Sequence, residues 1–339
     1  MSVKNKHLLH YVPHGIDYNV FKPLPTTSPE LVKFRKNIFK DAEYDFVFFY
    51  NSRNINRKRT ANIMLAFRMF CDNLPKEKSS KCILVLHTEK ILDAGTDLNA
   101  VGEAFLKDLN YLVLESRYEP KDMNLLYNIA DVTVNISSNE GFGLSVAESI
   151  ICGTPVIVNV TGGLQDQIGQ LDDDGKPVEF SRDFGSNNVK KYTKHGVWAK
   201  PVWPVTRVIQ GSPPTPYIFD DLCKWEDVAE AMMYWYIMDK EKRESYGAEG
   251  RRWAMNEGGL NHKNMAEQFV LAMDFTLNNF TPKPRYSLHT IDEHTGHSMA
   301  GNSLGFEIPS IDINKINREV QITELEMKLF PQKIKEELV

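Results

Sequence analysis

The sequence predicts an α/β fold with a doubly wound parallel sheet, followed by C-terminal helices and a polar tail. Three observations lead to this prediction: short apolar runs recur between residues 44 and 158, segments of helical periodicity separate them, and the apolar runs lack regular polar alternation. Nearly continuous apolar strands separated by helices are typical of a parallel sheet that is covered on both faces. We therefore expect a Rossmann-like domain.

The expected strands are short and rich in aromatic and β-branched residues, and the segments between them repeat apolar residues at helical spacing. Strands are predicted over residues 45–50, 82–86, 111–114, 132–136 and 155–158. Helices are predicted over residues 60–70, 123–130, 144–151 and 261–278, with a further helical pattern from 225 to about 253. Because ligands of such sheets bind beyond the carboxyl ends of the strands, we expect the site in the loops that begin near Asn51, His87, Ser137 and Asn159.

The pattern divides the 339 residues into three parts. Residues 1–43 form a lead-in to the first strand. Residues 44–280 form the predicted domain, with an irregular insertion at 165–224 that is long enough to suggest a function of its own. Residues 281–339 are a polar extension with only a weak helical pattern over 316–338.

Composition excludes several classes of protein. A hydrophobic fraction of 42% and a charged fraction of 25% are those of a globular protein, and the net charge of −5 argues against one that coats nucleic acid. The four cysteines show no C-x-x-C spacing, so we expect reduced thiols and neither a zinc site nor disulfides. The first ten residues have no apolar signal core, and no apolar run approaches the roughly eighteen residues of a membrane span. The expectation is a soluble, cytoplasmic protein without a transmembrane segment.

Residues 137–148 (SSNEGFGLSVAE) carry the strongest motif. A predicted strand ends before them, Gly141 and Gly143 let the backbone approach a ligand closely, and a helix is expected to begin near Leu144. The amides and dipole of a helix N-terminus favour an anion. Glu148, about one turn into that helix, can accept hydrogen bonds from hydroxyl groups. The alternative is a plain strand–loop–helix junction with a solvated Glu140, which glycines alone would favour.

The run from Glu140 to Glu148 resembles the E-x7-E motif of retaining GT-B glycosyltransferases, glycosyltransferase family 4 in particular. Three other segments resemble the same family in the same order. Residues 12–17 (VPHGID) with 21–23 (FKP) resemble its hinge element; Arg53 and Lys58 resemble its basic pair for the donor diphosphate; residues 155–158 with 161–163 (TGG) and Asp166 resemble the strand and glycine turn that follow the motif. Four matches in order favour the resemblance over chance.

The resemblance implies a nucleotide-diphosphate sugar as substrate. The sugar would be transferred with retention of its anomeric configuration, without a cofactor or metal. Catalytic roles are implied for Arg53, Lys58 and Glu140: the two cations neutralise the leaving diphosphate, and Glu140 contacts hydroxyls of the transferred sugar. Glu148 is implied to bind the ribose hydroxyls. The implied donor-binding residues are Gly15, Gly141, Phe142, Gly143, Leu144, Glu148, Gly162 and Gly163. The alternative for Arg53 and Lys58 is that Arg57, Lys58 and Arg59 only form a solvated basic turn.

Weaker candidates have structural explanations. His14 falls in the hinge loop, where positioning the backbone is favoured over catalysis. His87 follows a strand and either faces the nucleotide or is a satisfied, half-buried histidine. Trp198 and Trp203 either stack on a ligand or, as we favour, fasten the long insertion to the core. Residues 172–175 (DDDG) resemble a fragment of a calcium loop but lack its later ligands, so a solvated turn is expected.

The acceptor side is where the resemblance leaves a gap. It implies an acceptor-binding domain before the hinge, and the residues before 12 are too few to form one. The helix at 261–278 would then expose an apolar stripe made of Met265, Phe269, Leu271, Met273 and Phe275, to be covered by the tail or by another chain. The interpretations, in order, are an enzyme or part of one, a donor-binding subunit that needs a partner chain, and a binding protein without turnover. A GT-B enzyme of another class, such as an epimerase, is more distant.

Overall fold

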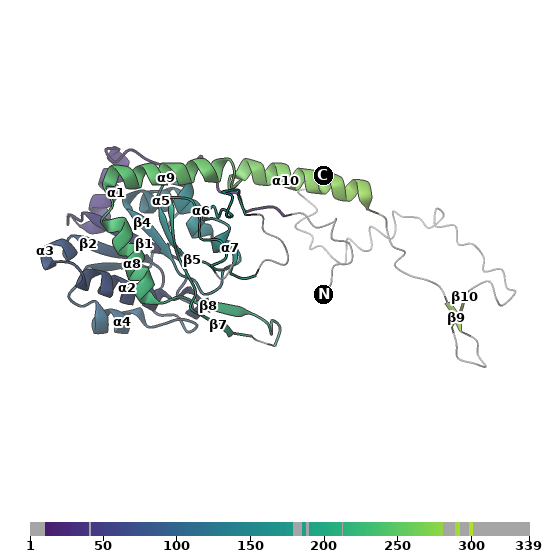
Figure 1. The fold of residues 1–339 in the computed structure, drawn as a ribbon, viewed down its shortest axis with the longest axis horizontal. Coiled ribbons are helices and arrows are strands. Elements are labelled where there is room, and N and C mark those ends of the chain that lie inside the picture. The colour runs from purple at the N-terminus through teal and green to yellow at the C-terminus, as the bar shows by residue number, and fades with distance from the viewer. Residues whose placement is uncertain are drawn as a thin grey trace, which may run out of the picture. The chain divides into compact units, whose positions relative to one another are not determined.

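A computed structural model describes residues 11–40, 42–178, 185–187, 190–211, 213–280, 289–291 and 298–300. Its centre is a six-stranded sheet in the order β3-β2-β1-β4-β5-β6, and every neighbouring pair is parallel. The order reverses between β1 and β4, which are neighbours in the sheet but not in the chain (Figure 1). The predicted doubly wound α/β fold is confirmed.

The first five strands of the sheet lie close to their predicted positions, and the sixth is additional. They are β1 (Phe46–Asn51), β2 (Cys82–His87), β3 (Tyr111–Leu114), β4 (Val132–Asn135), β5 (Val156–Asn159) and β6 (Ala199–Val202). The helices among the described residues are α1 (Pro29–Phe39), the 3-10 turn η2 (Asn56–Lys58), α2 (Thr60–Asp72), α3 (Lys76–Ser79), α4 (Leu98–Phe105), α5 (Pro120–Ile129), α6 (Leu144–Ile151), α7 (Gly162–Gln165), α8 (Trp225–Tyr236), α9 (Lys240–Met255) and α10 (His262–Asn279).

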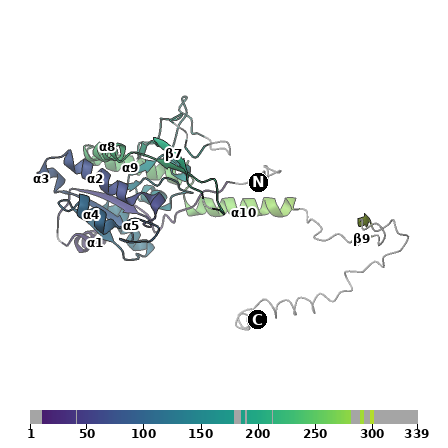
Figure 2. The ribbon, with the colours of Figure 1, turned by 90° about the horizontal axis from the view of Figure 1, so that it is seen from below.

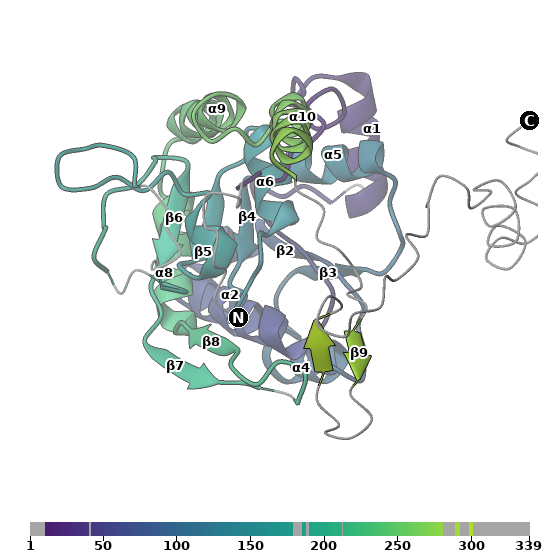
Figure 3. The same ribbon diagram turned by 90° about the vertical axis from the view of Figure 1, so that its right-hand side faces the viewer.

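Helices cover both faces of the sheet, and each face has its own hydrophobic core. Figure 3 shows α1, α5, α6 and α9 on one side and α2 and α8 on the other. Side chains alternate across β1, so that Phe46, Phe48 and Tyr50 join the core under α2 and α8. Val47 and Phe49 join the core under α5 and α6. This burial on both faces explains why the strands read as continuous apolar runs.

Two expectations about the second half of the chain are wrong. The helical pattern from 225 to 253 is two helices, α8 and α9, separated at residues 237–239. The insertion at 165–224 is not irregular throughout, because it contributes β6 to the sheet and an antiparallel hairpin of β7 (Thr206–Ile209) and β8 (Phe219–Leu222). Lys200 and Pro201 interrupt the apolar pattern of β6, and a proline is tolerated there because β6 is an edge strand.

Trp198 fastens the insertion to the core, as predicted. Its side chain is 4% exposed, stacks on Trp253 at a centroid distance of 4.9 Å, and donates from Nε1 to the Gln167 carbonyl at 3.1 Å. Residues 172–175 form the expected solvated turn, in which the Asp172 carboxylate accepts from the Lys176 amide at 2.9 Å. The four cysteines are unpaired thiols, as expected.

The C-terminal part forms a second compact unit from Asn279 onward. Its described residues make a short antiparallel pair, β9 (His289–Ile291) with β10 (Ser298–Ala300). The weak helical prediction over 316–338 lies outside the described residues. Figures 1 and 2 show α10, the last helix of the first unit, as one continuous helix.

Candidate functional site

The loops that follow β1 and β4 meet at the carboxyl edge of the sheet, at the point where the strand order reverses. The Ser138 amide donates to the Arg57 carbonyl at 2.7 Å, and the Ser138 hydroxyl donates to the same oxygen at 3.1 Å. This contact fixes the η2 turn of the first loop against the residues that precede Glu140. Crevices at such a reversal are the usual ligand sites of doubly wound sheets.

The loop between β4 and α6 leaves its backbone open on one side. Among the described residues, no atom lies within 4 Å of the position that a Cβ on Gly141 would take. Gly143 begins α6 with φ of +93°, which a glycine adopts without strain, and no described side chain caps it. Leu144, the first helical residue, is 49% exposed. The N-terminal amides of α6 therefore face an accessible space beside Gly141.

The following glycine turn supports this loop from behind. A Cβ on Gly162, whose φ is +46°, would lie 2.2 Å from the Glu140 carbonyl oxygen, and one on Gly163 would lie 2.4 Å from the Gly141 oxygen. The Gly163 amide donates to the Glu140 carbonyl at 2.9 Å. Both glycines thus permit close packing against the 140–143 backbone, which is a supporting role in the ligand-free structure.

Two cations converge on a single carboxylate oxygen. Lys58 Nζ pairs with Glu140 Oε2, and Arg57 Nη1 lies 3.3 Å from the same oxygen. The Lys58 side chain is 10% exposed, and burial lowers its pKa, while the bond to Glu140 acts in the opposite direction. Two positive charges against one negative charge leave a net positive cluster beside the open glycine loop.

Arg53 does not join this cluster. Its Nε lies 3.5 Å from Glu89 Oε1, and its side chain is 70% exposed. Arg57, which the sequence places in a possible solvated turn, occupies the position beside Glu140 instead. The 3-10 turn of residues 56–58 brings Arg57 and Lys58 to Glu140 together, and the sequence contains no signal that distinguishes Arg57 from Arg53.

Glu148 lies one turn into α6 and is held by a tyrosine. The hydroxyl of Tyr127, on α5, donates to Glu148 Oε2 at 2.6 Å. Burial raises the pKa of Glu148 to about 7, and the bond from Tyr127 partly offsets that effect. Asp166, which follows the glycine turn of residues 161–163, has its pKa raised by burial to about 6.

The predicted hinge residues pack against the start of α10. Gly15 needs to be small, since a Cβ there would lie 2.5 Å from the His262 Cα. The Ile16 amide donates to the Leu260 carbonyl at 2.8 Å. The His14 ring lies 4.9 Å from the ring of Phe142, and so connects the hinge to the glycine loop. Gly15 itself packs on the chain rather than facing the open loop.

The hairpin β7–β8 supplies two site-supporting acids that the sequence does not reveal. Asp220 accepts from Asn139, the neighbour of Glu140, and pairs with Arg59 at 3.3 Å. Asp221 is fully buried and accepts from Thr161 at 2.7 Å and from Arg207 at 2.8 Å. The hairpin therefore holds the loops after β4 and β5 in place.

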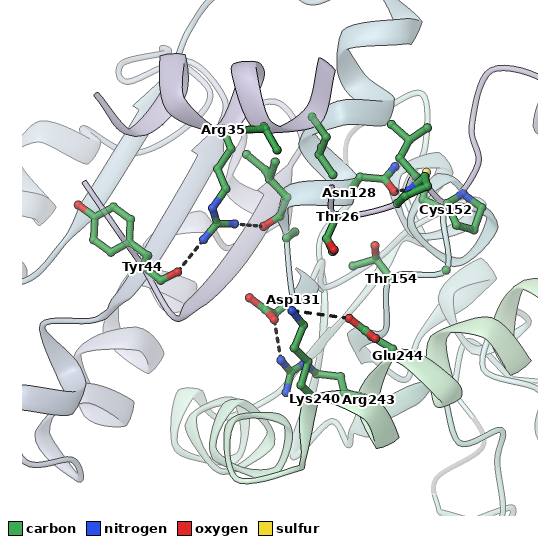
Figure 4. A pocket seen from close by; sticks show the side chains of 18 of the residues that line it. Thr26, Arg35, Tyr44, Asn128, Asp131, Cys152, Thr154, Lys240, Arg243 and Glu244 are labelled. Atoms are coloured by element: carbon green, nitrogen blue, oxygen red, sulfur yellow. Dashed lines mark hydrogen bonds and ion pairs between the residues drawn. The ribbon is translucent and has the colours of Figure 1, made fainter. Parts of the chain in front are cut away.

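A cavity of about 1010 Å³ lies at the opposite edge of the sheet, before the amino ends of β1, β4 and β5. Figure 4 shows five of its charged side chains paired with one another or with the backbone, namely Arg35, Asp131, Lys240, Arg243 and Glu244. Arg35 donates to the Tyr44 carbonyl at 2.6 Å, and Arg243 pairs with Asp131 at 2.6 Å. These contacts hold the helices to the sheet. The four basic and four acidic residues that line the cavity balance in charge.

Within the described ranges, no group of three or more His, Cys, Asp or Glu side chains is placed to hold a metal ion. In the same ranges, no helix combines the length and the apolarity that crossing a membrane requires.

Comparison with known proteins relates this chain to glycosyltransferases. Residues 99–179 match the family model Glycosyl transferases group 1. The matched segment includes β4, the glycine loop and α6. A D-inositol 3-phosphate glycosyltransferase of Thermomonospora curvata is 45% identical over 60 residues, which are 16% of this chain and 14% of that protein. One from Xylanimonas cellulosilytica is 25% identical over 185 residues, 52% of this chain and 42% of that protein. The chain thus spans less than half the length of these relatives.

Solved structures show the same fold. Anabaena HepE, in complex with UDP and glucose, superposes with a TM-score of 0.54 at 17% identity, covering 78% of this chain and 56% of that one. A glycosyltransferase from Rickettsia africae gives a TM-score of 0.54 at 16% identity, covering 79% and 57%. The domain has the Rossmann-like architecture of GT-B glycosyltransferases, and the family match supports a transferase.

Proposed function

We propose that this domain binds a nucleotide-diphosphate sugar at the carboxyl edge of its sheet and transfers the sugar to an acceptor with retention, without a metal ion. The observation that carries the proposal is the convergence of Lys58 and Arg57 on one oxygen of Glu140, beside the open backbone of Gly141. A net positive cluster next to a helix N-terminus is favourable for a diphosphate.

Each part of this site has a different role in the reaction. The bond between the sugar C1 and the phosphate oxygen breaks, and the diphosphate leaves with the electron pair. An acceptor hydroxyl oxygen forms the new bond to C1, and its proton passes to the departing diphosphate oxygen. Lys58 and Arg57 stabilise the diphosphate as its charge grows, which lowers the transition state more than the ground state. Glu140 accepts hydrogen bonds from sugar hydroxyls, and Glu148 from ribose hydroxyls.

A second candidate function is that of a donor-binding subunit that needs a separate acceptor-binding domain or chain. The observation in its favour is α10, on which none of the residues whose burial is described is buried. Phe269, Leu271 and Met273 are 52%, 61% and 60% exposed. Exposed apolar side chains on one helix are typical of an interface. In this case the chain alone binds the donor, and adding the partner restores turnover.

Calorimetry with UDP, GDP, ADP and their hexose conjugates tests the proposal. We expect one nucleotide sugar to bind and, with an acceptor, to release nucleoside diphosphate in the presence of EDTA; NMR of the product should show the anomeric configuration of the donor. If the chain binds a nucleotide sugar but shows no turnover with any acceptor or partner chain, it is a binding protein. If none of the nucleotides or nucleotide sugars binds, the proposal is overturned.

Glu140→Ala separates the sugar contact from the diphosphate contact. Because Glu140 is assigned to the sugar hydroxyls, the variant should bind the sugar nucleotide much more weakly than the wild type, while the bare nucleoside diphosphate loses little. Equal losses for both ligands would contradict the assignment.

A further inference from the structure

A chain of hydrogen bonds connects Glu148 to the ends of β1 and β2. Tyr127 donates to Glu148 at 2.6 Å, and Asn51 Nδ2 donates to the Tyr127 hydroxyl at 2.9 Å. His87 Nδ1 lies 2.8 Å from Asn51 Oδ1, and His87 Nε2 lies 3.0 Å from the Ser116 carbonyl oxygen. Tyr127 has no exposed surface, so water does not replace the middle of the chain.

The direction of these bonds depends on the charge of Glu148. When Glu148 is a carboxylate, Tyr127 donates to it, the Asn51 amide nitrogen donates to Tyr127, and the Asn51 oxygen faces His87. Both ring nitrogens of His87 then face acceptor oxygens. Only the imidazolium form donates from both nitrogens; a neutral ring leaves one lone pair against an oxygen.

When Glu148 is protonated, every hydrogen bond between Glu148 and His87 reverses its direction. Its hydroxyl donates to Tyr127, Tyr127 donates to the Asn51 oxygen after a half-turn of the amide, and the amide nitrogen donates to Nδ1 of a neutral His87. His87 keeps its Nε2 proton on the Ser116 carbonyl, so every contact remains satisfied. The two states differ by one proton moved from Glu148 to His87, and their net charge is the same.

We propose that His87 is a positioning residue which, through Asn51 and Tyr127, couples its own protonation to the ionisation of Glu148, so that a ligand diol bound to the Glu148 carboxylate drives His87 to its imidazolium form. The ligand part of this inference rests on the proposed function. A diol donates two hydrogen bonds and therefore stabilises the ionised carboxylate of Glu148. The carboxylate in turn favours the hydrogen-bond direction in which both ring nitrogens of His87 donate, which requires a charged His87.

The surroundings of the two ends make the neutral pair the resting state. Burial raises the pKa of Glu148 to about 7 and lowers the pKa of His87, so burial disfavours the charged form of each group. Glu89 is the carboxylate that faces His87, and the Tyr118 ring lies 5.3 Å from the imidazole. Near Glu148 the other titratable groups are the Cys152 thiol and, next to that thiol, Arg251 of α9.

A double-mutant cycle on the ligand-free protein decides the coupling. Ring 15N shifts of His87 are measured from pH 5 to 9 in the wild type, Glu148→Gln, Tyr127→Phe and the double variant. As Glu148 ionises near pH 7, the proton of the neutral His87 ring should move from Nε2 to Nδ1 in the wild type. Glu148→Gln should abolish this change in the wild-type background and should have much less effect once Tyr127 has lost its hydroxyl. Equal effects in both backgrounds would mean that the two groups interact only through space, and would overturn the proposal.

Two controls keep the cycle interpretable. Tyr118→Phe keeps the ring contact with His87 but lies outside the chain, so the effect of Glu148→Gln on His87 should be unchanged there. Thermal melting shows whether Tyr127→Phe is folded; if it is not, Asn51→Ala breaks the same chain one bond earlier and should give the same loss of coupling.

Ligand titration separates this inference from the proposed function. The nucleoside diphosphate that binds best among UDP, GDP and ADP should raise the pKa of His87 in the wild type but not in Tyr127→Phe, and its 2′,3′-dideoxy form should bind without raising it. Binding that leaves the His87 pKa unchanged overturns the ligand coupling alone. If none of the three binds, the proposed function fails, and the ligand-free cycle still decides the coupling.

Discussion

The two ends of the parallel sheet carry similar charged side chains that are arranged in opposite ways. At the amino end, Asp131 pairs with Arg243 at 2.6 Å and also accepts from the Val47 amide at 2.9 Å. At the carboxyl end, Lys58 and Arg57 share one oxygen of Glu140 beside a backbone that no described atom covers at Gly141. The charges at the amino end are balanced, whereas the carboxyl end has excess positive charge beside an open glycine loop.

This difference identifies the ligand site better than cavity size does. The cavity of about 1010 Å³ lies at the amino end, where every cation named above already has a carbonyl or carboxylate partner. A large space lined by satisfied groups offers a ligand little beyond contact area. Unbalanced charge next to free helix amides offers specific binding, so the charged carboxyl end is the better candidate.

The largest effect is expected at the amino end, on stability. Arg243→Ala leaves Asp131 without its cation and removes the stacking of the guanidinium on Phe46, whose ring centroid lies 4.7 Å away. Breaking a buried pair from one side costs about 3–5 kcal/mol, and urea unfolding should show a loss of that size. The dissociation constant for the donor, measured where the variant is still folded, should stay close to the wild-type value. A variant that keeps its stability but loses donor affinity would reverse the roles of the two ends.

The next effect is expected at the carboxyl end, on turnover. Lys58→Ala removes a cation from the position where the diphosphate gains charge, so kcat should fall about 10²–10³-fold, equivalent to about 2.7–4 kcal/mol. Its melting temperature should stay near that of the wild type, because Arg57 still neutralises Glu140. The matched control is Arg53→Ala, which removes a cation that is 70% exposed. A larger loss for Arg53→Ala than for Lys58→Ala would show that a ligand draws Arg53 into the site.

The third effect concerns the pH dependence of stability at Glu148. Its pKa is raised from the usual value of 4.5 to about 7, so the folded state retains a proton that the unfolded state loses between those pH values. This group's contribution is therefore fully present below about pH 4.5 and declines until about pH 7. Glu148→Gln should raise the free energy of unfolding by up to about 3 kcal/mol at pH 8 and change it little at pH 4.5, as urea titrations at both pH values would show. If Glu148→Gln raised the free energy of unfolding equally at both pH values, burial would not be the cause of the raised pKa of Glu148.

The sequence predicts the fold well because burial on both faces leaves a direct signal. Every strand of the sheet except β6 follows from an apolar run of the right length, and β6 escapes because Lys200 and Pro201 fall within four residues. The glycine loop and α6 are equally predictable, since glycines and a helix start can be read locally. Local pattern thus places the backbone of the site.

The side-chain pairings of the site are not predictable in the same way. Whether Arg53 or Arg57 reaches Glu140 depends on the orientation of the 3-10 turn Asn56–Lys58 relative to a loop more than eighty residues further along. The chain from His87 to Glu148 joins four different elements, and the sequence does not specify which way each side chain points. Such contacts follow from the packing of the elements and become visible only once they are packed.

The smallest effect is expected for a variant that tests whether a cation of the amino-end cavity contributes to ligand binding. Lys240 Nζ lies 3.9 Å from Glu244 Oε1, and the two side chains are 62% and 58% exposed, so this pair contributes little. Lys240→Ala should change the free energy of unfolding by less than about 0.5 kcal/mol and leave the affinity for nucleotide sugars unchanged. Calorimetry with inorganic pyrophosphate gives the sharper comparison, because that ligand lacks both sugar and base and reports charge alone. If Lys240→Ala weakens pyrophosphate binding as much as Lys58→Ala does, then positive charge at the amino end also recruits the ligand, and the contrast between the two ends no longer holds.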